Sequence, residues 1–170
     1  MTEQLWAPWR LAYVATPRPP AAEDPCFICE GLAADDDRRN LITLRTPLSV
    51  VVLNRFPYNN GHLLVAPRAH KGGLHQLDAG EILETQLTLR RMVALIDGLM
   101  RPDGYNIGLN LGRAAGAGLP GHLHWHIVPR WHGDTNFMPV LTDVKVIVQS
   151  LDALYELLTE RLRQEEVAGK

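Results

Sequence analysis

The sequence has few cysteines that could form disulfides and no segment typical of a membrane protein. Its 170 residues include only two cysteines, which argues against a fold built on disulfides. No apolar run approaches the ~20 residues that a membrane-spanning helix needs. Residues 1–6 lack the basic start and apolar stretch of a signal peptide, so we expect a cytoplasmic protein with no membrane partner. A net charge of −2 gives no reason to expect general affinity for nucleic acid.

The remaining composition is that of an ordinary globular domain. Hydrophobic residues make up 46% and charged residues 21% of a chain long enough to bury a sizeable core. We predict an N-terminal arm over residues 1–25, which is too rich in proline for a long regular element. A central domain over residues 26–140 and a C-terminal helical extension over residues 141–170 would follow.

Hydrophobic patterning predicts three strands in the first two thirds of the chain. Two apolar runs, residues 48–53 and 62–66, flank Asn59-Asn60-Gly61. Asn-Gly between apolar runs is a strong turn signal, so these runs predict an antiparallel hairpin with a longer connection. Residues 105–111 predict a further strand.

Two amphipathic helices complete the predicted order. Residues 78–100 carry apolar side chains at helical spacing, with Asp78 and Glu81 spaced as in a capping box. Residues 142–165 predict a last helix by the same spacing. Mostly antiparallel strands with one helix between them and one at the end are typical of the α+β class.

Three histidines alternate with apolar residues near residue 124. His122, His124 and His126 would share one face of an extended strand, and the apolar residues between them would face a core. Such a set is typical of a metal site, such as a catalytic zinc held by three histidines, or of a nucleophilic histidine with helpers. A run of surface histidines on an exposed strand is the third interpretation.

The stretch before these histidines is rich in glycine. Backbone N–H groups at Gly112, Gly116 and Gly118 can approach a phosphate closely, although the Gly-Lys-Ser/Thr of a Walker P-loop is absent. Glycines in place of acidic residues favour an anionic ligand over a hydrolytic metal. Histidine can attack phosphorus, and a neighbouring imidazole with a pKa near ~6.5 can donate a proton.

At this point the sequence resembles a known family. Residues 122–128, His-Leu-His-Trp-His-Ile-Val, match the His-φ-His-φ-His-φ-φ signature of the histidine triad (HIT) superfamily. The resemblance covers roughly residues 26–131, including Gly61-His62-Leu63-Leu64-Val65-Ala66-Pro67. The opening Leu-Trp-Ala-Pro-Trp-Arg and residues 129–137 resemble the branch that contains bacterial diadenosine tetraphosphate phosphorylases. The family implies a HIT-like fold, with a mostly antiparallel sheet, one long central helix and a C-terminal helix.

The resemblance implies an enzyme that transfers a nucleotidyl group. His124 would attack the α-phosphorus of a dinucleoside polyphosphate or purine nucleotide and form a nucleotidyl-histidine, with its other ring nitrogen held by the carbonyl of His122. Water or inorganic phosphate would release the product, and the branch favours phosphorolysis to ADP and ATP. The remaining implied roles are phosphate-oxygen binding by His126 and His62, ribose binding by Asn54, and phosphate binding by Asn110, Gly116 and Gly118.

Other functions stay open at this point. A nucleoside phosphoramidate or dinucleotide hydrolase of the HIT type, or a nucleotide-binding regulatory protein, would use the same pocket, and a metal-dependent hydrolase is an unrelated alternative. Relatives often carry Ser, Thr or Gln shortly before the first histidine, whereas residues 118–121, Gly-Leu-Pro-Gly, offer no side-chain donor. Backbone N–H groups would have to replace it.

The two cysteines form a Cys-x-x-Cys at Cys26 and Cys29. This spacing favours metal or redox chemistry in a reducing compartment. Some bacterial HIT proteins hold a structural zinc with such a pair, the histidine of a Pro-x-x-His and the first triad histidine, which here are His70 and His122. The alternative is two buried cysteines and a surface histidine. The resemblance implies no cofactor for catalysis itself, and family members usually form homodimers through the long helix.

Two further histidines have no predicted role. We expect His75 and His132 to be exposed to solvent, with His132 a weaker candidate for a place near the site.

Overall fold

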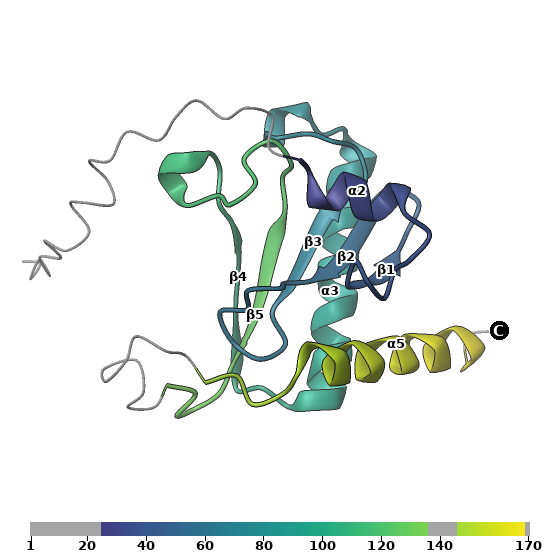
Figure 1. The fold of residues 1–170 in the computed structure, drawn as a ribbon, viewed down its shortest axis with the longest axis vertical. Helices are drawn as coiled ribbons and strands as arrows, with labels where there is room; N and C mark the ends of the chain where they lie inside the picture. Colours follow the sequence, from purple (N-terminus) through teal and green to yellow (C-terminus); the bar gives the residue numbers. More distant parts are fainter. Residues whose placement is uncertain (1–24, 136–145, 169–170) are drawn as a thin grey trace, which may run out of the picture.

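The fold is a single antiparallel sheet with helices on both faces (Figure 1). The structure, a computed structural model, describes residues 25–135 and 146–168, so most of the predicted N-terminal arm lies outside the described residues. Within them the strand order is β1-β2-β3-β5-β4. The strands are β1 (Ile42–Arg45), β2 (Ser49–Leu53), β3 (Leu63–Pro67), β4 (Gly104–Leu109) and β5 (Trp125–Arg130).

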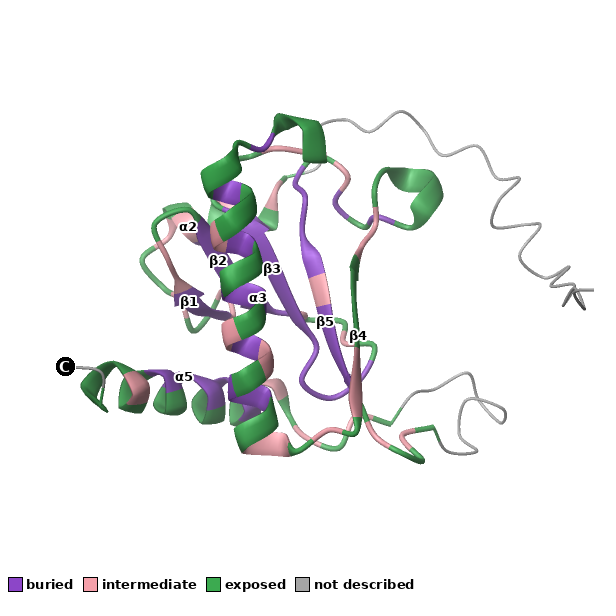
Figure 2. Cartoon of the chain, turned by 180° about the vertical axis from the view of Figure 1, so that it is seen from behind, coloured by how far each residue is buried: buried purple, intermediate pink, exposed green. Residues whose placement is uncertain are grey.

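The two faces of the sheet bury different sets of side chains because neighbouring residues of a strand point in opposite directions. On one face, Val51, Val65 and Ile127 pack against α3 (Ala79–Met100). On the other, alternate residues of β2 and β3 pack with Ile28 of α2 (Phe27–Ala33). Figure 2 shows the buried side of α3 turned toward the sheet. The expected α+β class is confirmed.

The predicted hairpin and long helix are confirmed. β2 and β3 pair in register from Ser49 opposite Pro67 to Leu53 opposite Leu63. α3 begins as the capping box predicted: Asp78 accepts from the N–H of Glu81 at 2.9 Å, and Glu81 accepts from the N–H of Asp78 at 2.9 Å. The helix ends at Met100, as expected.

The C-terminal helix begins later than the sequence pattern predicted. α5 spans Leu151–Ala168, whereas the prediction began at residue 142; residues 142–145 lie outside the described residues, and residues 146–150 are not helical. Ser150 provides the reason, because its hydroxyl accepts from the N–H of Ala153 as an N-cap does. Leu154, Leu158 and Leu162 then join the core that α3 covers.

Several other boundaries differ from the predictions. α2 and β1 were not predicted, and residues 113–115 form a short 3-10 helix, η2 (Arg113–Ala115), inside the glycine-rich loop. β5 begins at Trp125, so the first two triad histidines precede the regular strand. No helix in residues 25–135 and 146–168 is long and apolar enough to cross a bilayer.

Candidate active site and metal centre

Four histidines meet on the face of the sheet opposite α3. His122 and His124 lie in the segment leading into β5, His126 lies within β5, and His62 immediately precedes β3. His62, His122 and His124 are buried. Leu123, Trp125 and Ile127, between the triad histidines, are buried in the core against α3, so the predicted alternation is confirmed.

The tautomer of His124 follows from its backbone partner. Its Nδ1 lies 2.8 Å from the carbonyl oxygen of His122, and a carbonyl can only accept a hydrogen bond. Nδ1 therefore carries the proton, and the lone pair of a neutral His124 is on Nε2. The ring of His124 lies edge-on to that of His126, with centroids 5.1 Å apart.

A hydrogen-bond chain sets the tautomers of His62 and His126. The N–H of Tyr58 donates to Nδ1 of His62 at 3.0 Å, which leaves the proton of neutral His62 on Nε2. That Nε2–H donates to Nδ1 of His126 at 2.9 Å. The proton of neutral His126 is consequently on its own Nε2. A ligand in front of the triad would meet a lone pair on His124 and an N–H on His126.

His126 is neutral at physiological pH. Burial and, to a lesser extent, the nearby His124 lower the pKa of His126 to about 4. Burial also lowers the pKa of His122, although its bond to the carbonyl of Pro67 opposes the shift. The site can thus donate hydrogen bonds from neutral imidazoles without carrying a fixed positive charge at these two residues.

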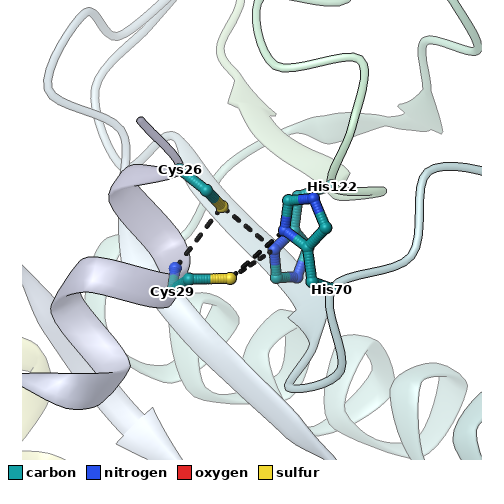
Figure 3. Close-up of side chains that lie close together, drawn as sticks. All are labelled: Cys26, Cys29, His70 and His122. Atoms are coloured by element: carbon teal, nitrogen blue, oxygen red, sulfur yellow. Dashed lines mark hydrogen bonds between the residues drawn. The ribbon is translucent and has the colours of Figure 1, made fainter. Parts of the chain in front are cut away.

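A second cluster lies directly behind the triad. Cys26 and Cys29 at the start of α2, His70 after β3, and His122 point toward one another (Figure 3), and their donor atoms all lie within 4.8 Å of one another. Cys26 Sγ is 3.2 Å from His122 Nδ1, and Cys29 Sγ is 3.2 Å from His70 Nδ1. Typical zinc bond lengths in a tetrahedral site put neighbouring donors roughly 3.5 Å apart, so these four residues fit a metal ion.

The cluster and the triad share His122. Its Nε2–H donates to the carbonyl of Pro67 at 2.8 Å, which leaves the Nδ1 lone pair facing the two sulfurs. Burial, with a contribution from Cys26, raises the pKa of the Cys29 thiol to about 11, so a metal would have to displace its proton. The expected grouping of Cys26, Cys29, His70 and His122 is present.

The other residues expected in the site surround the histidines at different distances. Asn54 contacts His62, with Nδ2 3.2 Å from Nδ1, and lines a cavity of about 470 Å³ between α2, β2 and β3. Asn110 lines a separate groove that also contains His126. Gly116 adopts a φ of +87°, which only glycine takes without strain, and a Cβ at Gly116 or Gly118 would meet no atom within 4 Å. Their predicted phosphate contacts remain predictions.

His75 and His132 are exposed, as expected. His132 lies beyond the end of β5, where its Nδ1 is 3.0 Å from Asp103. It therefore contacts an acidic side chain and lies at the opposite end of β5 from His122 and His124.

Comparison with known proteins identifies the family. The HIT domain model matches residues 37–133. An AP-4-A phosphorylase of Mycobacterium tuberculosis is 38% identical over 167 residues, covering 95% of this chain and 86% of that protein. The chain belongs to the HIT family. The asymmetrical bis(5'-nucleosyl)-tetraphosphatase of Schizosaccharomyces pombe is 33% identical over 90 residues, covering 53% of this chain and 49% of that protein.

Solved structures share the HIT fold. A zinc-bound histidine triad family protein from Mycobacterium smegmatis superposes with a TM-score of 0.66 at 22% identity, over 85% of this chain and 97% of that chain. The HIT-like fold expected from the sequence is confirmed.

Sequence reasoning missed the residues that hold this HIT site in shape. The ring of Tyr58 stacks on His126, with centroids 5.6 Å apart and planes 22° apart, and lies 4.6 Å from His62. Asn59 donates to Asp134 at 2.7 Å, and Asp134 also accepts from Arg130, so the loop that carries Tyr58 is tied to the end of β5. The available signal was an aromatic residue four positions before His62.

Proposed function

We propose that this HIT-family chain is an enzyme that transfers the nucleotidyl group of a dinucleoside polyphosphate, with His124 as the nucleophile. The observation that carries the proposal is the fixed tautomer of His124, whose Nδ1–H donates to the carbonyl of His122. No hydrogen bond from the described residues 25–135 and 146–168 occupies its Nε2, which is the atom needed for attack on phosphorus.

His126 is the proposed partner in the transition state. Its neutral Nε2–H can donate to a phosphate oxygen as charge develops there, which is the effect that usually supplies the largest share of catalysis. His62 is 1% exposed and uses both ring nitrogens within the protein. We therefore assign His62 to positioning His126, in place of the direct phosphate contact that the resemblance implied.

The leaving group supports a polyphosphate over an amine. An amine must be protonated as it departs, and no side-chain donor precedes His122 in residues 118–121. A terminal phosphate, with a pKa near ~6, departs at neutral pH largely without a proton. The relative from M. tuberculosis, named as an AP-4-A phosphorylase, supports the same choice and suggests phosphate as the acceptor. ATP would leave first, and phosphate would then convert the adenylyl-histidine to ADP.

The cavity beside Asn54 is the proposed site of the transferred nucleoside. It combines apolar walls from Phe27, Leu41 and Leu64 with the Asn54 carboxamide at the side nearest His62. Such a mixture suits a base and a ribose hydroxyl. Asn110 and the loop containing Gly116 and Gly118 are the proposed phosphate contacts.

We infer that zinc is the ion of the four-residue cluster, because two thiolates and two imidazoles form a closed tetrahedral set. Such a set leaves no open position, so the metal would stabilise the fold and take no part in the chemistry.

We also propose a homodimer. β4 is an edge strand of the sheet, and α3 exposes Ile82, Leu83 and Leu87, which together offer a surface for a second copy.

Product analysis tests the proposed reaction. Purified protein is mixed with diadenosine tetraphosphate, with and without inorganic phosphate, and the products are separated by chromatography. ADP and ATP that appear only with phosphate are the expected result. AMP and ATP formed without phosphate would make the enzyme a hydrolase, and no turnover would favour a phosphoramidate substrate or a regulatory binding protein.

A further inference from the structure

A groove of about 410 Å³ lies beside His126 on the side away from Asn54. Gly108 is the register partner of His126, and Asn106 is the partner of Val128, so these residues lie on the same face of the sheet as the triad. The residues that line the groove include Tyr58, Asn106, Gly108, Asn110, His126 and Val128.

The groove and the nucleoside cavity flank the histidines. Figure 1 shows β2, β3, β5 and β4 side by side in the sheet. The strand residues that line the cavity beside Asn54 come from β2 and β3, whereas those that line the groove come from β5 and β4. Neighbouring strands are only about 4.8 Å apart. A ligand with a group in each recess would therefore pass its middle across His126.

Tyr58 provides a flat wall for the groove. Its side chain is half exposed, with 51% of the residue accessible, and its ring is held by stacking on His126. Nucleic acid bases stack on exposed aromatic rings with little dependence on the base. A solvent-facing ring fixed next to a catalytic histidine is well placed for such a contact.

Gly108 leaves room on the floor of the groove. A Cβ built on Gly108 would meet no atom within 4 Å, so protein packing does not require glycine at this strand position. Its neighbour on the same face, Asn106, is fixed because Arg130 donates to its Oδ1 at 2.8 Å. The floor of the groove is thus held in place at Asn106, and no side chain fills it beside His126.

We propose that this groove binds the second nucleoside of the dinucleoside polyphosphate, the one that departs with the leaving phosphates, with its base stacked on Tyr58. The proposal rests on the proposed function. It makes the enzyme selective for substrates with a base at both ends over substrates with one nucleoside and the same phosphates.

A pair of glycine substitutions tests the groove. Gly108→Leu fills it, whereas Gly104→Leu places the same side chain on the same strand and face but outside the groove, also with no atom within 4 Å of its Cβ. Two substrates are compared: diadenosine tetraphosphate, and adenosine 5'-tetraphosphate, which lacks only the second nucleoside. We expect Gly108→Leu to lower the ratio of their kcat/KM values by about tenfold, or 1.4 kcal/mol, and Gly104→Leu to preserve it.

Tyr58 is tested by the same ratio. Tyr58→Ala keeps the backbone N–H that binds His62 and should lower the ratio about tenfold, while Tyr58→Phe keeps the ring face and should restore it. Equal losses for both substrates in Gly108→Leu, or a wild-type enzyme that does not distinguish them, would overturn the proposal.

A binding measurement separates this proposal from the proposed function. Calorimetry on the His124→Ala variant gives dissociation constants for both compounds without turnover. Tighter binding of diadenosine tetraphosphate, lost on adding Gly108→Leu, would support the groove even if the wild type cleaved neither compound. Equal binding of the two compounds would refute the groove even if the reaction proved correct.

Discussion

His62 offers the sharpest test of how this site works. The ring bridges Tyr58 N–H and His126 Nδ1, and Asn54 Nδ2 lies 3.2 Å from it. In His62→Ala these groups lose their partner in a position that is 1% exposed. An unsatisfied buried polar group costs about 1–3 kcal/mol, so a loss of about 3–5 kcal/mol in the free energy of unfolding follows, with the cavity included.

We expect His62→Ala to alter catalysis by changing the protonation and orientation of His126. Without a donor on its Nδ1, and with more water around it, the pKa of His126 should rise from about 4 toward ~6.5. At pH 5 the neutral fraction of His126 would then fall from roughly 90% to as little as about 3%. By analogy with partners that orient metal-bound histidines, kcat should also fall about 10–100-fold at neutral pH.

The assay is the pH dependence of kcat/KM, which reports ionisations of the free enzyme. For the wild type we expect the His126 acid limb near pH 4, and for His62→Ala a limb displaced toward pH 6.5. His62→Gln, which can still donate toward His126, should lie between them. A variant that lost affinity alone, with a raised KM, an unchanged kcat and an acid limb still near pH 4, would show that His62 contacts phosphate directly and would refute this reasoning.

Three other perturbations have definite expected results. His124→Ala should abolish turnover and keep nucleotide affinity within about tenfold, or ~1.4 kcal/mol; turnover near the wild-type rate would rule out His124 as the nucleophile. Cys29→Ser should lower the bound zinc, measured by elemental analysis, and lower Tm by about 2–4 °C for each kcal/mol lost; an unchanged metal content and Tm would refute the zinc assignment. Because the folded pKa of His126 is below ~6.5, its contribution to stability is present above pH 6.5 and lost as the pH falls to about 4; denaturant unfolding of wild type and His126→Asn should show a weaker pH dependence in the variant.

The elements that the sequence predicted well are those in which one local signal sufficed. The hairpin had a turn signal between two apolar runs, and α3 had a capping box followed by apolar residues at helical spacing. α2 was missed because its seven residues are too few to show periodicity. The predicted start of the last helix at residue 142 was too early, because apolar spacing does not reveal where an N-cap intervenes; Val148, inside the predicted range, lies before α5 and is 82% exposed.

The site was predictable in its residue types but not in its internal contacts. The grouping of Cys26, Cys29, His70 and His122 followed from a resemblance and is present in the fold. Which nitrogen carries the proton depends on partners that the fold supplies, such as the distant carbonyl of Pro67 for His122 and the side chain of His62 for His126. Contacts of that kind depend on strand register and loop path, which residue types do not encode individually.

His122 takes part in both the cysteine cluster and the triad, and this constrains any redesign of the enzyme. Its side chain belongs to the cysteine cluster, and its carbonyl sets the tautomer of His124. A metal-free version that replaced the cysteines would have to hold the main chain of residue 122 by some other packing before His124 could act as the proposed nucleophile. Conversely, a library that varies position 122 would return inactive variants of two kinds: those that have lost the metal site, and those in which the main-chain carbonyl has moved away from His124. A metal assay run beside the activity screen would distinguish the two kinds.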